Sequence, residues 1–380
     1  MMDEQEYQRR LKEIRDEIDK IDSQLLPLFL QRMDCSVRVA KVKQEANAPV
    51  LNTGREQEIL SKMRERAGEY GEEAVALYRA IMSASRLRQH QLLADGGELR
   101  ELERSASRQM PERPAGIVCQ GVEGAYSHQA ALQLFHDAPI SFEGTWKQVF
   151  EAVQNERAQF GVLPVENSAA GSVNGVYDLI LQYRFYIVGA TAVKVEHCLA
   201  VWDRDDPVTA VASHPQALSQ CSEYIESHGL QAIEYSNTAA AAKYISEEHP
   251  KGVSVLCSKE AAEQYGLTIL KEAVQNEKNN QTRFIVISKE PILPEDANKI
   301  SLCFSIPHTP GALHTVLERF AIRGLNMTKI ESRPIPGSTF EYDFYLDFTG
   351  NLHVKETLEL ICALKDELPR FSFLGNYSER

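Results

Sequence analysis

The chain has 380 residues, which is too long for one ordinary hydrophobic core and predicts two or three domains. Hydrophobic residues make up 43% of the chain and charged residues 25%, as is usual for a soluble globular protein. The formal net charge of −13 argues against a nucleic-acid-binding protein, which normally presents a basic face. No run reaches the ~18 apolar residues of a membrane-spanning helix, and the N-terminal segment is too charged for a signal peptide. We therefore expect a cytoplasmic protein that binds neither nucleic acid nor membrane.

The seven cysteines are scattered singly, without a Cys-x-x-Cys pair or a His/Cys cluster. Neither a disulfide framework nor a zinc site is predicted, and apolar neighbours favour buried, reduced thiols. No Gly-x-Gly-x-x-Gly turn follows a predicted strand, and no phosphate-binding Gly-Lys-Ser/Thr loop is present. The absence of both loops argues against a nicotinamide enzyme or an NTPase. We therefore expect no metal and no cofactor.

From residue 5 to about residue 46, apolar residues recur at spacings of 3 and 4, which predicts a long helix. One helix cannot bury such a seam on itself, so it requires helical partners from its own chain or another. Pro27 should kink this helix or remove one backbone hydrogen bond. Helices over 55–67 and 72–94 follow a turn at 47–54, giving an all-α domain over residues 1–95. Glycines, charges and prolines over 96–114 predict a linker.

Polar residues interrupt the apolar faces of these helices. Arg32 lies in step with the seam, and Lys43 points the same way because the 11 residues between them make three turns plus roughly 20°. Arg15 faces elsewhere, and Ser85 and Gln89 interrupt the third helix at i, i+4. A charge on a buried seam is unfavourable unless it is paired. A solvated face with ordinary ion pairs is the alternative for each residue alone.

This spacing resembles that of the all-helical chorismate mutases, in which two long helices intertwine in a dimer. The reaction is a unimolecular rearrangement of a dicarboxylate, so the enzyme holds the reactive conformer and stabilises charge on the ether oxygen. The resemblance implies that Arg15 of the partner subunit and Arg32 bind the carboxylates. Lys43 and Gln89 would face the ether oxygen as catalytic residues. The implied substrate-binding set is Arg15, Arg32, Lys43, Asn52, Arg55, Glu56, Ser85 and Gln89, with Glu56 on the substrate hydroxyl and Asn52 where enteric members carry aspartate.

From residue 115 the period changes, and short apolar runs alternate with helical patterns. Strands are predicted over 116–119, 160–165 and 283–287, and helices over 127–135, 146–155 and 238–247. This alternation predicts an α/β domain over residues 115–290 with a largely parallel sheet.

Four clusters in this domain carry candidate chemistry: residues 121–128, residues 164–168 with 171–173, residues 213–216 and residues 280–284. Singly, each could be turn or capping chemistry, and Ser127 and Thr238 are credible helix caps without a further role. Together they resemble prephenate dehydratases over about 175 residues, most specifically in the Pro-Val-Glu-Asn-Ser loop and the Thr-Arg-Phe triplet. Val122 and Ala125 depart from the usual proline and threonine.

The resemblance implies two α/β lobes with the site in the cleft between them. Aromatisation drives the reaction, so the enzyme chiefly helps hydroxide to leave, and a nearby donor lowers that barrier. Thr282 is the implied catalytic donor, and Arg283 is either a carboxylate partner or a structural residue. The implied substrate-binding set is Glu166, Asn167, Ser168, Ser213, Gln216, Thr282 and Arg283.

After a break at 291–298, residues 299–380 show a β-α-β-β-α-β order that predicts a ferredoxin-like module. The motifs at 308–313 and 331–334 resemble the two phenylalanine-binding motifs of ACT regulatory domains. The alternative is that Pro310 and Gly311 only shape a turn. In that family the ligand lies between paired modules, which implies a homodimer or larger. The implied effector site is Gly311, Ala312, Leu313, Glu331, Ser332, Arg333 and Pro334.

The three segments together resemble the bifunctional chorismate mutase/prephenate dehydratases (P-proteins). This implies conversion of chorismate to prephenate, then to phenylpyruvate with loss of CO₂ and water, under feedback inhibition by L-phenylalanine. A non-catalytic amino-acid sensor is one alternative, although Thr282, Arg283 and the seam cations argue against it. A dehydratase that acts on arogenate is another, since arogenate differs only by an amino group on the side chain.

Overall fold

The computed structural model describes residues 3–380 except 47, 94–96, 174, 336 and 339–340. The chain divides into two compact units. The first comprises residues 1–101, 305–324 and 354–371, and the second comprises 102–304, 325–353 and 372–380. In the described ranges, no helix is both long and apolar enough to cross a membrane.

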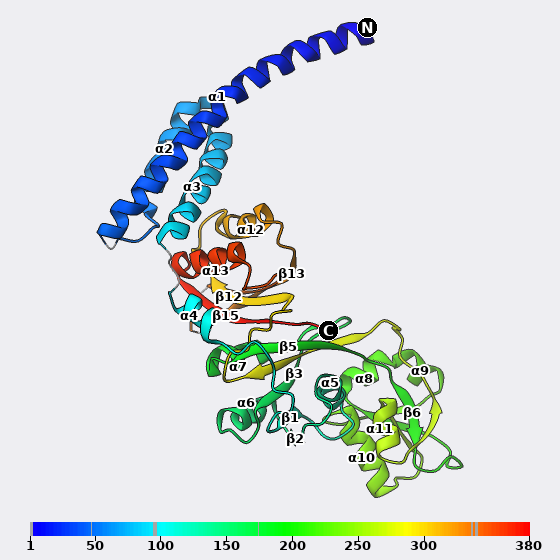
Figure 1. Ribbon diagram of the computed structural model, residues 1–380. Helices are drawn as coiled ribbons and strands as arrows, with labels where there is room; N and C mark the ends of the chain where they lie inside the picture. Colours follow the sequence, from blue (N-terminus) through cyan, green and yellow to red (C-terminus); the bar gives the residue numbers. More distant parts are fainter. Residues whose placement is uncertain (1–2, 47, 94–96, 174, 336, 339–340) are drawn as a thin grey trace. The chain divides into compact units, whose positions relative to one another are not determined.

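The first unit is helical (Figure 1). The side chain of Asp3 accepts a hydrogen bond from the Glu6 amide at 2.8 Å and so caps the first helix, which stays helical through Pro27. A proline removes one hydrogen bond without ending a helix that neighbouring turns support. The unit contains α1 (Glu4–Glu45), α2 (Thr53–Ala67), a 3₁₀ turn (Gly68–Tyr70), α3 (Gly71–Leu93), α12 (Ala312–Ile322) and α13 (Lys355–Glu367).

The stretch predicted as a linker contains a helix, α4 (Gly97–Ser105), preceded by residues 94–96 outside the described ranges. Leu99 of α4 is buried, and Glu98 forms an ion pair with Lys365 of α13. The charges that indicated a linker therefore form the polar face of a short amphipathic helix.

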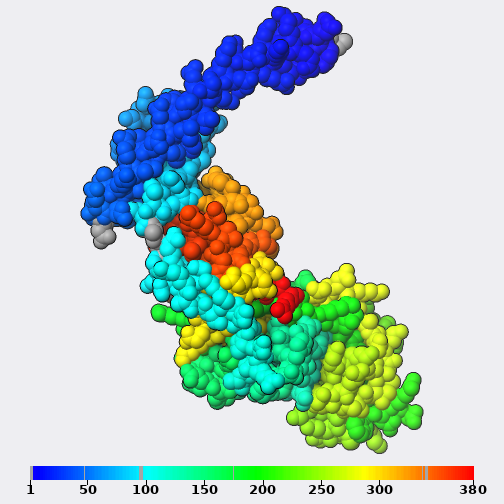
Figure 2. All heavy atoms as spheres, viewed as in Figure 1, coloured from blue at the N-terminus to red at the C-terminus, as the bar shows by residue number. Residues whose placement is uncertain are grey.

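The apolar seam of α1 is exposed within the described chain. Its large side chains from Ile14 to Val42 are between 44% and 64% exposed, and only Ser36 and Ala40 of α1 are buried. The space-filling view shows the N-terminal part of α1, in dark blue, projecting beyond α2 and α3 (Figure 2). Cys35 lies on this helix and is exposed, so the expected burial of the thiols is wrong there, whereas the other six cysteines are buried.

The second unit contains two α/β lobes, each built on its own sheet. The first sheet has the order β2-β1-β3-β11-β5, with β4 paired to β3. Its strands are β1 (Ile117–Gln120), β2 (Ile140–Glu143), β3 (Phe160–Asn167), β4 (Gly171–Ser172), β5 (Tyr186–Lys194) and β11 (Gln281–Ser288). Its helices are α5 (Tyr126–Leu134), α6 (Trp146–Gln154) and α7 (Val176–Tyr183).

The second sheet has the order β10-β6-β9-β7-β8. Its strands are β6 (Cys198–Val201), β7 (Ala210–Ser213), β8 (Gln231–Glu234), β9 (Val253–Cys257) and β10 (Thr268–Lys271). Its helices are α8 (Pro215–Gln220), α9 (Ser222–Ser227), α10 (Thr238–Glu248) and α11 (Lys259–Gln264).

Both sheets are mixed, so the prediction of a largely parallel sheet is wrong. β1 runs parallel to β2 and β3, but β11 is antiparallel to both β3 and β5. The cause is the route of the chain, which leaves the first sheet after β5 and returns to it as β11. The chain leaves β5 at Lys194 and re-enters β11 beside it at Gln281, and neighbours joined at the same end of a sheet run in opposite directions.

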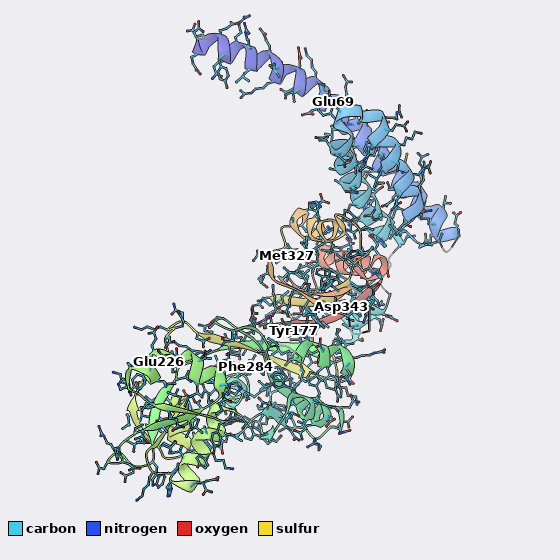
Figure 3. The ribbon with its side chains drawn as sticks, turned by 180° about the vertical axis from the view of Figure 1, so that it is seen from behind. Glu69, Tyr177, Glu226, Phe284, Met327 and Asp343 are labelled. Carbon is cyan, nitrogen blue, oxygen red and sulfur yellow. The ribbon has the colours of Figure 1, made fainter. Side chains whose placement is uncertain are left out.

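The core of the first lobe lies on both faces of its sheet. Phe284 of β11 is buried on one face, and Tyr177 of α7 is buried on the other (Figure 3). The ring of Tyr177 also packs against Tyr345, with ring centroids 4.9 Å apart. A side chain at Gly161 of β3 would come within 3 Å of Val149 and Ile287, so this strand lies close to its covering helix.

Residues 299–380 follow the predicted β-α-β-β-α-β order. The strands form a sheet in the order β13-β14-β12-β15. They are β12 (Lys299–Ser305), β13 (Met327–Pro334), β14 (Tyr342–Thr349) and β15 (Arg370–Tyr377), with α12 and α13 between them in sequence.

Candidate active sites

A cavity of about 160 Å³ lies in the second unit, where residues of its two lobes face each other. The first lobe contributes the ends of β3 and β11, and the second contributes α8 and the start of α10. Such a cleft at strand ends is a common place for a small-molecule site. The lining residues are Tyr126, Asn167, Val195, His197, His214, Gln216, Ala217, Gln220, Asn237, Thr238 and Thr282.

Asn167 and Thr282 are directly paired across β3 and β11. The Asn167 amide Nδ2 donates to the Thr282 hydroxyl at 2.9 Å. Asn167 Oδ1 accepts from the backbone amides of Ala169 and Ala170 at 3.1 and 2.9 Å, which fixes the orientation of the side chain. Because the Thr282 hydroxyl accepts this bond, its own hydrogen can be donated into the cavity.

The facing wall carries uncharged polar groups. His214 caps α8 by accepting from the Gln216 amide at 3.2 Å, and His197 Nε2 lies 3.1 Å from Gln220 Oε1. Burial lowers the pKa of His197 against the opposing effect of its bond to Gln220. Burial likewise lowers the pKa of His214 against the charge of Glu234. Both imidazoles are therefore neutral at pH 7 and offer hydrogen bonds without charge.

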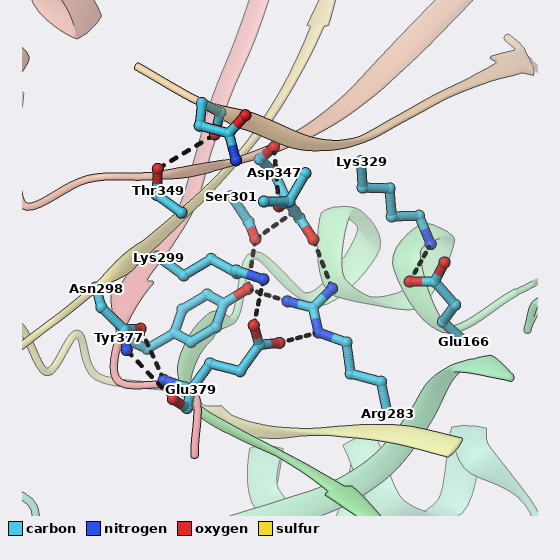
Figure 4. Close-up of polar contacts among 12 residues, drawn as sticks. Glu166, Arg283, Asn298, Lys299, Ser301, Lys329, Asp347, Thr349, Tyr377 and Glu379 are labelled. Carbon is cyan, nitrogen blue, oxygen red and sulfur yellow. Dashed lines mark hydrogen bonds and ion pairs between the residues drawn. The ribbon is translucent and has the colours of Figure 1, made fainter. Parts of the chain in front are cut away.

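Glu166 and Arg283 point away from the cavity. They neighbour Asn167 and Thr282, and successive side chains of a strand point to opposite faces. The Glu166 carboxylate lies 3.5 Å from Lys329 Nζ (Figure 4). Arg283 contacts Asp347 at 2.6 Å, donates to the Tyr377 hydroxyl at 2.7 Å and pairs with Glu379. These contacts favour the structural alternative for Arg283.

Two predicted serines also do not line the cavity. The hydroxyl of Ser213 is fully buried and donates to the Leu256 carbonyl at 2.6 Å. Ser168 donates to the Asn279 carbonyl at 3.3 Å and accepts from the Gln281 amide at 2.9 Å, so it ties two loops together. Sequence reasoning in turn missed His197 and Gln220, which stand outside every recognised motif and gave no signal.

The first unit gathers part of the second predicted set. Ser85 of α3 contacts Ser36 of α1, and Lys43 donates to the Val50 carbonyl. Gln89 donates to the Ser85 carbonyl at 3.3 Å, while its buried Oε1 has no hydrogen-bond partner within the described chain. Burial lowers the pKa of Lys43, the charge of Glu56 opposes this, and Arg86 adds to it.

Three other residues of this set, Asn52, Arg55 and Arg15, form no hydrogen bond or ion pair with that cluster within the described chain. Asn52 accepts from the Arg55 amide at 3.0 Å and caps α2, and the Arg55 side chain pairs with Glu58 at 2.7 Å. Arg15 is exposed on the projecting part of α1. At 1.5 Å per residue it lies about 26 Å along the helix from Arg32. One chain therefore does not bring Arg15 to the other cations.

The residues of the two effector motifs are placed as follows. Gly311 has a φ of +79° and precedes Ala312 and Leu313 in the first turn of α12. On β13, Glu331 accepts from Ser172, and Arg333 pairs with Asp178 at 3.2 Å. Ser332 and Pro334 end the same strand. Across the described residues, no group of three or more His, Cys, Asp or Glu side chains is arranged to hold a metal ion.

Two family profiles match this chain. The profile of prephenate dehydratase matches residues 117–292, and that of chorismate mutase type II matches residues 14–90. A bifunctional chorismate mutase/prephenate dehydratase of Aquifex aeolicus (strain VF5) is 33% identical over 380 residues, which covers 97% of each chain.

Two solved structures are also similar. One is described as a novel type of quorum-quenching acylase; it is 31% identical with a TM-score of 0.64, over 70% of this chain and 98% of that one. The other is a prephenate dehydratase of Arthrobacter aurescens in complex with L-Phe, 27% identical with a TM-score of 0.63, over 70% of this chain and 90% of that one. Because the Aquifex aeolicus similarity runs along nearly all of both chains, the chain belongs to the bifunctional chorismate mutase/prephenate dehydratases.

Proposed function

We propose that this chain rearranges chorismate to prephenate at the Lys43 cluster and dehydrates prephenate at the cavity around Thr282. The observation that carries the second assignment is the Asn167–Thr282 hydrogen bond at the cavity wall. One similar structure is described as an acylase, so the fold alone does not identify the reaction. Family membership along the whole chain is what favours the two-step conversion.

At the cavity, the ring hydroxyl must leave as CO₂ is lost. A threonine hydroxyl is a weak acid, so Thr282 donates a hydrogen bond or relays a proton rather than ionising. Asn167 holds its oxygen, which fixes the direction of the donated hydrogen. The neutral wall formed by His214, Gln216 and Gln220 then orients the substrate.

At the mutase site, catalysis consists of holding the folded conformer and stabilising the developing oxyanion. Lys43 and Gln89 supply the donors in this proposal. The buried Oε1 of Gln89, an acceptor without a hydrogen-bond partner within the described chain, supports a polar ligand beside this side chain. Arg32 is half-buried on the same face as Lys43 and suits a carboxylate.

The exposed seam of α1 and the isolation of Arg15 support an intertwined homodimer. The β-α-β-β-α-β order and the strand order β13-β14-β12-β15 support a ferredoxin-like ACT module that binds L-phenylalanine at the 308–313 and 331–334 motifs. The domain boundaries and the cytoplasmic location stay predictions.

The two-step assignment is tested by following chorismate to its end product. Wild-type protein should release phenylpyruvate, whereas Thr282→Ala should accumulate prephenate because its dehydration slows by about 10²-fold or more. Thr282→Ser keeps the hydroxyl and should retain part of the rate. Arogenate supplied in place of prephenate measures substrate preference. Unchanged dehydration in the alanine variant would refute the role of Thr282.

The lowered pKa of Lys43 predicts the alkaline limit of the mutase. The ammonium form is the donor, so kcat/KM should fall as pH rises through a pKa below the ordinary lysine value of 10.5. Lys43→Arg stays charged and should move this limb to higher pH. The control is Lys41→Arg at an exposed position on the same helix, which should leave the profile unchanged. An unmoved limb in Lys43→Arg would exclude Lys43 as the titrating donor.

L-phenylalanine should bind at millimolar concentration or below and inhibit dehydration. Gly311→Ala should abolish that binding, because the helix start must present its backbone amides and a side chain is strained at φ +79°. Gly324→Ala is the matched control, since Gly324 is also left-handed (φ +65°) and lies beyond the other end of α12. Calorimetry that detects no binding to the wild type would refute the effector site.

Complementation tests the shared site. Arg15→Ala and Arg32→Ala homodimers should both be nearly inactive as mutases. Co-refolding gives about half heterodimers, in which one site carries both lesions and the other neither, so about one quarter of the wild-type activity should return. Dimer exchange is verified separately with a tagged chain. Proven exchange without recovery would show that each chain uses its own Arg15.

A further inference from the structure

A buried cation lies beside the predicted mutase site but belongs to no motif recognised in the sequence. Arg86 follows Ser85 on α3, so its side chain points roughly 100° away from the Ser85–Gln89 face. Its side chain is only 8% exposed. Taking an arginine out of water is unfavourable unless carboxylates surround it, so its partners identify its role.

Arg86 joins two carboxylates from different helices. Its terminal nitrogen Nη1 pairs with Glu56 of α2, and its Nε lies 3.2 Å from Glu367 of α13. The planar guanidinium holds both in fixed directions, which a lysine ammonium does not do. The Glu56 side chain is still 25% exposed, so a substrate hydroxyl can reach it.

Glu367 is the fixed end of this chain of charges. Its side chain is 6% exposed and also contacts Arg319 of α12 and His90 of α3, the latter at 2.9 Å. Burial works to raise the pKa of Glu367, but the hydrogen bond from His90 and the charges of Arg319 and Arg86 outweigh it and hold that pKa at about 2. Glu367 is therefore ionised at every working pH and anchors Arg86.

Such a cation suits the chemistry of the proposed reaction. In the proposed function, Glu56 accepts a hydrogen bond from a substrate that carries two carboxylates. An uncompensated Glu56 carboxylate would repel that dianion. Arg86 offsets its charge and fixes its rotamer, while the exposed part of Glu56 stays available.

We propose that Arg86 is a positioning residue of the mutase site, which holds Glu56 for the substrate hydroxyl and is itself anchored by Glu367. This inference rests on the proposed mutase function. Arg86 acts through Glu56 and does not touch the reacting atoms. The charge of Arg86 on α3 also acts on Lys43 of α1, together with the opposite charge of Glu56 on α2.

The experiment compares Arg86→Leu and Arg86→Lys in the full-length chain. Arg86→Leu should lower mutase kcat/KM by about tenfold or more, mainly through a higher KM, as is usual when a functional group loses its supporting partner. Arg86→Lys keeps the positive charge but loses the planar guanidinium, so its kcat/KM should lie between those of the wild type and Arg86→Leu. Arg88→Leu on the exposed side of the same helix is the matched control and should match the wild type. Because Arg86 lies in the helical first unit, the helix signal in circular dichroism and the thermal unfolding of each variant report whether that unit is folded.

Two readouts separate positioning from a merely structural role. In a Glu56→Gln background the further effect of Arg86→Leu should largely vanish, since the arginine acts through that carboxylate. The alkaline limb of Arg86→Leu should move to higher pH, because Arg86 lowers the pKa of Lys43 and its loss reverses that effect. Equal losses in both backgrounds, or an unmoved limb, would overturn the proposal.

If Arg86→Leu does not fold, Arg86→Lys is compared in the wild-type and Glu56→Gln backgrounds instead. An equal loss of mutase kcat/KM in both backgrounds would again overturn the proposal. A wild-type chain without any mutase activity would refute the proposed function itself. An active wild type with a fully active, folded Arg86→Leu variant would refute only the role of Arg86.

Discussion

The pairing of β3 with β11 is the constraint on which the second unit depends. β11 is the returning strand of the chain, and it is held between β3 and β5. Because side chains alternate along a strand, the same two strands offer Asn167 and Thr282 to the cavity and Glu166 and Arg283 to the opposite face. There Lys329, Asp347 and Tyr377, from strands of residues 299–380, hold them in place. A one-residue slip of β11 would exchange the two faces, so these ion pairs also fix the register that places Thr282 at the cavity.

The acidic composition makes the placement of cations decisive in both units. In a chain with a net charge of −13 the cations are outnumbered, and two largely buried arginines among the described residues are each shared between carboxylates. Arg283 lies between Asp347 and Glu379, and Arg86 lies between Glu56 and Glu367. Their effect is on geometry more than on stability, because a buried ion pair gains little net free energy over an apolar pair of the same volume. The polar groups proposed to meet substrate are then Lys43 and Gln89, which have only backbone carbonyls as hydrogen-bond partners within the described chain, and the Thr282 hydroxyl.

Sequence reasoning identified the cavity residues that belong to local motifs. Thr282, Asn167 and Gln216 belong to motifs and line one cavity, although long stretches of sequence separate them. It did not separate Thr282 from Arg283, because a motif gives neighbours in sequence and the strand sends them to opposite faces. It also predicted a parallel sheet, because alternating strands and helices do not reveal that β11 returns beside β5. Arg86 escaped notice for a related reason: its two partners come from α2 and from α13, and no spacing in the sequence joins them.

One chain alone leaves the apolar seam of α1 exposed. Its apolar side chains from Ile14 to Val42 are about half exposed, and burying the exposed part of each is worth about 1 kcal/mol. Seven such side chains on each of two helices give on the order of 14 kcal/mol, which is comparable with the 4–15 kcal/mol that association is estimated to cost. The seam alone therefore brings two chains close to balance, and any further contact between them makes pairing favourable. The proposed pairing would account for both features of α1, since it would bury the seam and bring an Arg15 that lies about 26 Å from Arg32 to a site on another chain.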